Sequence, residues 1–107
     1  MFDIEGVFKS MAGAVQNTVT TSWPQVQGVW QQFVQTNKDL LQQIADGRIS
    51  GDLTNADVES YMVDLKNTLT TQLLALAVMG EAIAQQAANA ALDIFWGAVN
   101  KVIGLIL

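Results

Sequence analysis

Residues 46–57 read DGRISGDLTNAD, and this stretch decides the fold because it forms either a calcium-binding loop or a turn between two helices. Counted from Asp46, it places Gly51 at the sixth position and oxygen-bearing side chains at positions 1, 5, 9 and 12, as in an EF-hand loop. The third position, however, is Arg48, a permanent cation with no acceptor atom. The twelfth is Asp57 rather than the usual glutamate. We therefore predict that these residues bind no calcium.

The same residues favour a turn that joins two helices. Gly47 suits the position just past a helix end, where the backbone often becomes left-handed. Thr54 followed by Asp57 is typical of a capping box, in which the side chains and backbone N–H groups of the two residues bond reciprocally. The sequence thus predicts a turn at 47–53, with one helix ending at 46 and the next beginning at 54.

Apolar residues recur at three- and four-residue spacing through most of the chain, which predicts an all-α fold in one domain, 1–107. We expect helices over about 2–21, 23–46 and 54–106. The face of the first carries Ile4, Phe8, Met11, Val15 and Val19. Pro24, the single proline, predicts a kink or break near that residue. Gly80 is a candidate site for a bend in the last helix.

Two arrangements fit this pattern. In the first, the chain is a long antiparallel helical hairpin with a kink near Pro24, and copies of the chain cover its apolar surface as a helical bundle. In the second, breaks near residues 22 and 80 give a compact four-helix bundle that hides much of that surface alone. The first arrangement is our fold prediction.

The C-terminal segment is too apolar for an ordinary surface helix. On a helical wheel its polar and small residues fall in one narrow stripe: Gln86, Asn89, Asp93, Gly97, Asn100 and Gly104. A usual surface helix has an apolar face of somewhat over 100°, whereas here nearly everything outside the stripe is apolar. Such a helix is buried in its own chain, in copies of the chain or in lipid. We choose these candidate interface residues: Trp30, Phe33, Leu73, Leu76, Ile83, Ile94, Phe95, Trp96, Val99 and Ile103.

Composition removes most functional classes. The chain has no His and no Cys, and its ten carboxylates are scattered, so we predict no enzyme activity, no cofactor and no metal site. Its five Lys and Arg residues form no cluster, which argues against nucleic acid, and no small-molecule substrate is evident. The opening MFDIEG carries acids where a signal peptide carries positive charge. Polar residues also interrupt every stretch that would otherwise cross a membrane cleanly.

These exclusions leave two hypotheses of different kinds. The first is a self-associating structural or interaction protein, a homo-oligomer assembled through the apolar 73–107 face. The second is a membrane-active helical protein that forms pores, takes part in lysis or binds a membrane peripherally, with the polar stripe facing water. The sequence leaves the compartment, the oligomer number and any other partner open.

Overall fold

A computed structural model describes residues 2–106, and this part of the chain is all-helical with no strand. The helices are α1 (Ile4–Val19), α2 (Trp23–Ser50), α3 (Asn55–Leu74) and α4 (Glu81–Ile106). A short 3₁₀ helix, η1 (Thr20–Ser22), links α1 to α2.

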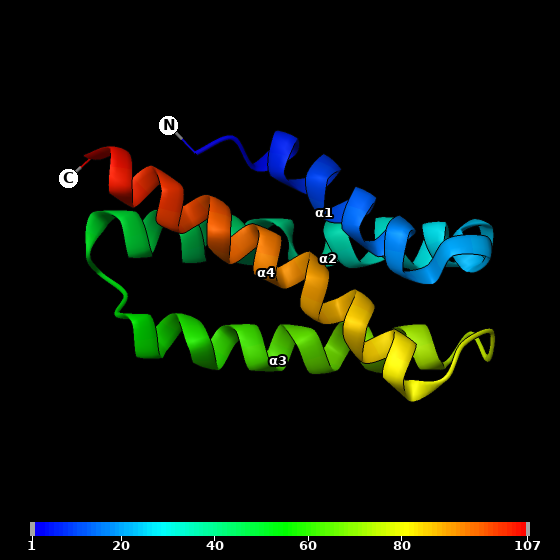
Figure 1. The fold of residues 1–107 in the computed structure, drawn as a ribbon. Helices are drawn as coiled ribbons and strands as arrows, with labels where there is room; N and C mark the ends of the chain where they lie inside the picture. The colour runs from blue at the N-terminus through cyan, green and yellow to red at the C-terminus, as the bar shows by residue number, and fades with distance from the viewer. Residues whose placement is uncertain (1, 107) are drawn as a thin grey trace.

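The helices alternate in direction along a molecule of 42 × 23 × 21 Å (Figure 1). Both ends of the described chain lie at one end of the molecule, beside the α2–α3 turn, and η1 and the 75–80 loop lie at the other. α4 crosses the molecule diagonally and contacts α1, α2 and α3. α2 likewise contacts the other three helices, so α2 and α4 both lie at the centre of the packing.

The core consists of apolar side chains, and no polar or charged residue among those described is buried. The first helix buries the face that its spacing predicts, Ile4, Phe8, Met11, Val15 and Val19. Phe95 of α4 is fully buried, and its ring packs edge-to-face against Phe2 with centroids 5.9 Å apart. Aromatic pairs in this geometry add to the area that they bury, so the N-terminal residues and α4 hold each other in place.

The chain turns between α1 and α2 ahead of the proline, and no kink is seen at Pro24 itself. Thr20 has a φ of 50°, in the left-handed region, and begins η1. Pro24 lies in the first turn of α2, where its missing N–H has no helical partner to lose.

The α2–α3 turn begins later than the sequence predicts. α2 continues through Gly47 to Ser50, and Gly51 takes the left-handed conformation with a φ of 90°. Gly47 has a different role, because a Cβ atom there would lie 2.8 Å from Cγ of Leu53, which folds back over it. The first five positions of the calcium-loop window are thus helical, and Nε of Arg48 donates to Oδ1 of Asn55 at 2.7 Å.

We expect Gly51→Ala to destabilise the protein by about 1 kcal/mol or more, since alanine is strained at positive φ. Gly13 provides the matched control. It lies within α1, and a Cβ atom there meets nothing within 4 Å. Gly13→Ala should therefore stabilise by up to about 1 kcal/mol through helix propensity. Urea denaturation measures the change in the free energy of unfolding for each variant. If both substitutions stabilised the protein, or both destabilised it, the left-handed role of Gly51 in the turn would be contradicted.

A capping box begins α3. The backbone N–H of Asp57 donates to Oγ1 of Thr54 at 3.1 Å, and the backbone N–H of Thr54 donates to Oδ2 of Asp57 at 2.9 Å. The bond from the Thr54 backbone, followed by that from its hydroxyl, lowers the pKa of Asp57 below its ordinary value. The charged carboxylate is thus the form that the folded helix end favours.

Because the pKa of Asp57 is lowered in the fold, the difference in stability between wild type and an uncharged variant should depend on pH. A lowered folded pKa stabilises the fold above the unfolded value, about 3.9, and that contribution disappears as pH falls through the folded pKa. Asp57→Asn keeps a side-chain acceptor but has no charge to titrate. Wild type should therefore melt above Asp57→Asn near pH 7, and the gap should close below about pH 4. A gap that stays constant down to about pH 2 would contradict the prediction.

The helix expected over 54–106 is two helices. A continuous helix of that length would reach about 80 Å at 1.5 Å per residue, nearly twice the longest extent of the molecule. Instead α3 ends at Leu74, the N–H of Ala77 bonds to the carbonyl of Leu74 at 3.0 Å, and Ala77 takes a positive φ of 56°. The break lets α4 fold back and bury its apolar side within the chain.

Candidate functional site

The candidate interface residues divide into two groups. The first group is buried inside the chain: Trp30, Phe33, Leu73, Phe95 and Val99. Four of them have no exposed surface with which to contact a second copy, and Trp30 is 5% exposed, so in this fold the five belong to the core. The second group is partly or well exposed: Leu76, Ile83, Ile94, Trp96 and Ile103. The reason for the division is the break at 75–80, which turns much of the 73–107 face inward.

The polar stripe of α4 lies on the surface along its whole length. All of its residues are exposed: Gln86, Asn89, Asp93, Gly97, Asn100 and Gly104. Asp93 accepts a hydrogen bond from Nζ of Lys66 on α3 at 3.0 Å. In the folded chain the stripe therefore faces solvent, and it is tied to α3 at one point.

A groove of about 500 Å³ separates α1 from α2. Phe8, Trp23 and Trp30 supply its aromatic surface, and Gln27 and Gln31, one turn apart on α2, stand on its rim. Its lining contains no Ser, Thr, Cys or His. The groove thus offers apolar and amide groups together with the charged side chains of Glu5 and Lys9.

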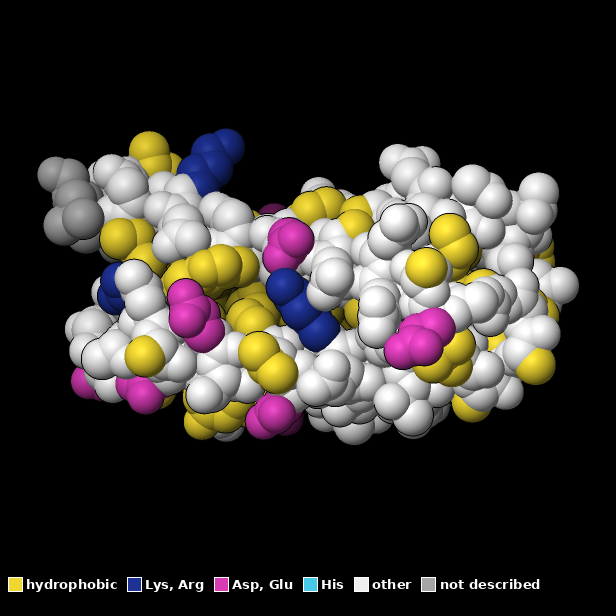
Figure 2. Space-filling view, turned by 60° about the horizontal axis from the view of Figure 1, so that its bottom comes forward, with side chains coloured by type: hydrophobic (Ala, Val, Ile, Leu, Met, Phe, Trp, Pro, Cys, Tyr) yellow, Lys and Arg dark blue, Asp and Glu magenta, His cyan; other side chains and the backbone are white. Residues whose placement is uncertain are grey.

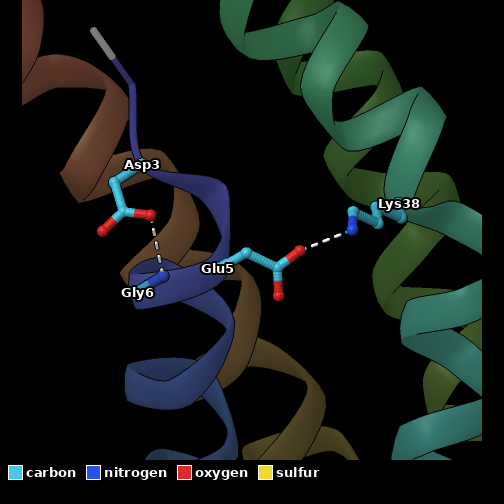
Figure 3. A network of polar contacts seen from close by, with 4 residues as sticks. All are labelled: Asp3, Glu5, Gly6 and Lys38. Carbon is cyan, nitrogen blue, oxygen red and sulfur yellow. Dashed lines mark hydrogen bonds and ion pairs between the residues drawn. The ribbon is translucent and has the colours of Figure 1, made fainter.

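An ion pair joins the helices beside this groove (Figure 3). Glu5 reaches from α1 to the ammonium group of Lys38 on α2, and two residues earlier Asp3 caps α1 by accepting from the N–H of Gly6 at 3.1 Å. The hydrogen bond and the charge of Glu5 raise the pKa of Lys38 above its ordinary value. Both side chains are largely exposed, so the pair adds little stability.

Charge is distributed unevenly along the molecule. Residues 10–37 and 67–92, here called the uncharged half, contain one charged residue, Glu81, whereas the rest of the chain holds the other nine acids and all five bases. These residues form the end of the molecule where η1 and the 75–80 loop lie. Figure 2 shows that end as hydrophobic and uncharged side chains around a single acidic patch.

The uncharged half also carries exposed apolar residues in and beside the 75–80 loop, of which the sequence predicts Leu76 and Ile83 as interface residues but not Leu74, Val78 or Met79. Leu74 and Val78 are 36% and 38% exposed, and Ile83 is 38% exposed. With the half-buried Leu76 and Met79 they form what we call the apolar tip. The signal was present as an uncharged run from 67 to 80, but an expected continuous helix placed these residues on opposite faces.

Among residues 2–106 no cluster of acidic side chains could hold a metal ion. No helix in the same range is long and apolar enough to cross a membrane. Comparison of the chain with models of known families, with curated proteins and with solved structures finds no match.

Proposed function

We propose that this chain is a non-enzymatic, self-associating α-helical interaction protein whose copies pack together through the uncharged half. The observation that carries the proposal is the apolar tip. It exposes Leu74, Val78 and Ile83 within ten consecutive residues, and Glu81 in the same segment is the one charged side chain of that half. Exposed apolar patches mark interfaces, and charged residues are depleted at interface centres.

This proposal narrows the surface that the sequence predicts. Much of the 73–107 face is buried in the chain's own core. Association along the whole of α4 would therefore require the helices to separate. The tip needs no such change, because its side chains already reach solvent. A bundle formed between copies would therefore be built around the 74–83 segment rather than along the polar stripe.

Light scattering over a concentration series at low and high salt tests the proposal. A contact between uncharged surfaces gains nothing from ion pairs, and salt screens only the repulsion between chains of net charge −5. The weight-average mass should rise with concentration. It should rise equally or more steeply at about 0.5 M than at about 0.05 M salt. Association that disappears at high salt would contradict an uncharged contact.

The alternative is that the apolar tip enters the surface of a membrane. The hydroxyl of Ser22 donates to the carbonyl of Val78 at 3.5 Å, and the next residue, Trp23, is half-buried. An exposed apolar loop with a tryptophan nearby fits an interfacial site as well. Flotation with neutral phosphatidylcholine vesicles separates the alternatives, because neutral lipids do not repel the acidic chain. Under our proposal the protein stays in the aqueous fraction. Protein that floats with the vesicles, and no longer does so after Val78→Asp, would favour the membrane.

A further inference from the structure

The loop between α3 and α4, residues 75–80, holds an alanine in a strained conformation. Ala77 has a φ of 56°, in the left-handed region, where a Cβ atom is crowded and glycine is usual. Gly80 lies three residues later but does not take this conformation, since Gly51 is the one glycine with a positive φ among the described residues. The strain therefore falls on the residue type that favours a helix most.

The sequence of the loop does not stop a helix from continuing through it. It reads ALAVMG, without proline, and alanine, leucine and methionine are strong helix formers. The N–H groups of Leu76 and Ala77 bond to carbonyls three residues back, at 3.2 and 3.0 Å. A continuous helix would give the backbone groups at the end of α3 and the start of α4 regular partners. Local chemistry thus favours one helix over 55–106, and the packing of α4 on its own chain opposes it.

The surface that receives α4 is present on every copy of the chain. α4 contacts α1, α2 and α3, and the ring of Phe95 packs against Phe2 at 5.9 Å. Small side chains on α4 let the helix axes approach closely. Its buried residues are Ala84, Ala87, Ala88, Ala91, Leu92, Phe95 and Val99. A second copy offers the same three helices, so α4 can make identical contacts on another chain.

Little besides this packing ties the loop to its own chain. The hydroxyl of Ser22 in η1 donates to the carbonyl of Val78 at 3.5 Å, which is long for a hydrogen bond. Among residues 2–106 no other hydrogen bond joins the loop to α1, η1 or α2. Short hinge loops under strain favour the exchange of an element between two copies. The 75–80 loop has both properties.

We infer that the 75–80 loop is a hinge at which two copies exchange α4, so that α4 of each copy packs against α1, α2 and α3 of the other. In the exchanged form the loop is helical, and α3 and α4 join into one helix about 80 Å long. The strain at Ala77 is released in both copies, while the contacts of α4 are kept. Exchange differs from contact at the apolar tip, which leaves each α4 on its own chain, and it does not depend on that contact.

Two single-cysteine variants detect the exchange, because the chain has no native cysteine. Lys66→Cys and Asp93→Cys, one of them carrying a mass tag, are mixed at high concentration, warmed to just below the melting temperature, cooled, diluted and treated with a short bismaleimide. Nζ of Lys66 and Oδ1 of Asp93 lie 3.0 Å apart within one chain. The two thiols therefore meet between chains only where α4 of one copy lies on α3 of the other.

Ala56→Cys mixed with Asp93→Cys is the matched control. Ala56 is exposed on the same helix, about 15 Å before Lys66, and lies beyond the reach of the reagent. The mixture with Lys66→Cys should give at least about tenfold more covalent heterodimer, because exchange holds its two thiols at a high effective concentration. A smaller difference would overturn the exchange. If wild type still associated, the contact at the apolar tip would stand.

Ala77→Gly tests the hinge itself. Glycine is unstrained at this φ and weakens a continuous helix, so it favours the single chain for two reasons. Each exchanged dimer contains two hinges, and the equilibrium constant for exchange should fall at least about 100-fold. Ala82→Gly is the control, because Ala82 is exposed in the first turn of α4 and helical in both forms. It should change that constant by about threefold or less.

Size-exclusion chromatography after the same warming measures the dimer that persists on dilution. Exchanged copies separate slowly, because their helices must come apart before each α4 returns to its own chain. Equal amounts of persistent dimer from Ala77→Gly and Ala82→Gly would overturn the role of the 75–80 loop as the hinge.

Discussion

Phe95→Ala is expected to lower the free energy of unfolding by about 3–5 kcal/mol, the largest effect of any substitution considered for the fold. The ring of Phe95 has no exposed surface and packs against Phe2 at 5.9 Å, so its removal leaves a cavity that the helices around it cannot fill. Small domains are stable by about 5–15 kcal/mol in total. Urea denaturation followed by circular dichroism measures the loss.

Leu105→Ala on the same helix is the control. Leu105 is 80% exposed, and its truncation should change the free energy of unfolding by about 0.5 kcal/mol or less. Comparing the two variants shows whether Phe95 acts as a core residue, as the structure places it, or as an interface residue, as the sequence predicts. If Phe95→Ala weakened association but lowered the stability of the monomer by less than about 1 kcal/mol, Phe95 would be a contact between copies and the packing of α4 would be wrong.

The double variant Leu74→Asp with Val78→Asp should weaken self-association by at least about 100-fold, or 2.7 kcal/mol. Each substitution removes apolar area from the apolar tip and places a carboxylate where the partner would desolvate it. In a symmetric contact each change also counts twice. Both side chains are over a third exposed, so the fold itself should survive with an unchanged circular dichroism spectrum. Sedimentation velocity over a dilution series gives the dissociation constants.

A variant of equal charge controls for general repulsion. Tyr61 and Val63 are exposed apolar residues on α3 outside the uncharged half. Tyr61→Asp with Val63→Asp adds the same two negative charges at a different place, and it should leave association within about threefold of wild type. Equal weakening by both double variants would mean that net charge, and not the apolar tip, controls assembly.

The local features of the fold could be predicted from the sequence because they depend on near neighbours. The spacing of Ile4, Phe8, Met11, Val15 and Val19 defines the buried face of α1 without any knowledge of its partners. The Thr54 and Asp57 capping box likewise needs only residues three apart.

The helix ends and the core partners could not be predicted, because they depend on contacts between distant residues. Gly47 and Gly51 are equally suited to a left-handed turn, and it is the packing of Leu53 over Gly47 that leaves Gly51 to take it. The break at Ala77 goes against local preference, since alanine favours a helix. It follows from the gain in folding α4 back over the core.

The same limit explains why the candidate interface residues divide into buried and exposed ones. An apolar residue on a helical wheel faces either its own core or a partner, and the wheel does not distinguish them. The spacing alone leaves Phe33, Leu73 and Phe95 open to a contact between copies, whereas the structure buries them completely. The exposure of Leu74 and Val78 depends on where α3 ends and the 75–80 loop begins, which the spacing does not define.

Sedimentation equilibrium of the wild-type chain, from about 1 to about 100 µM, tests the central claim of self-association most directly. The mass should rise from 11.6 kDa at the lowest concentration towards twice that value or more, and Leu74→Asp with Val78→Asp should show no such rise. A wild-type chain that remains at 11.6 kDa across the whole range would contradict it.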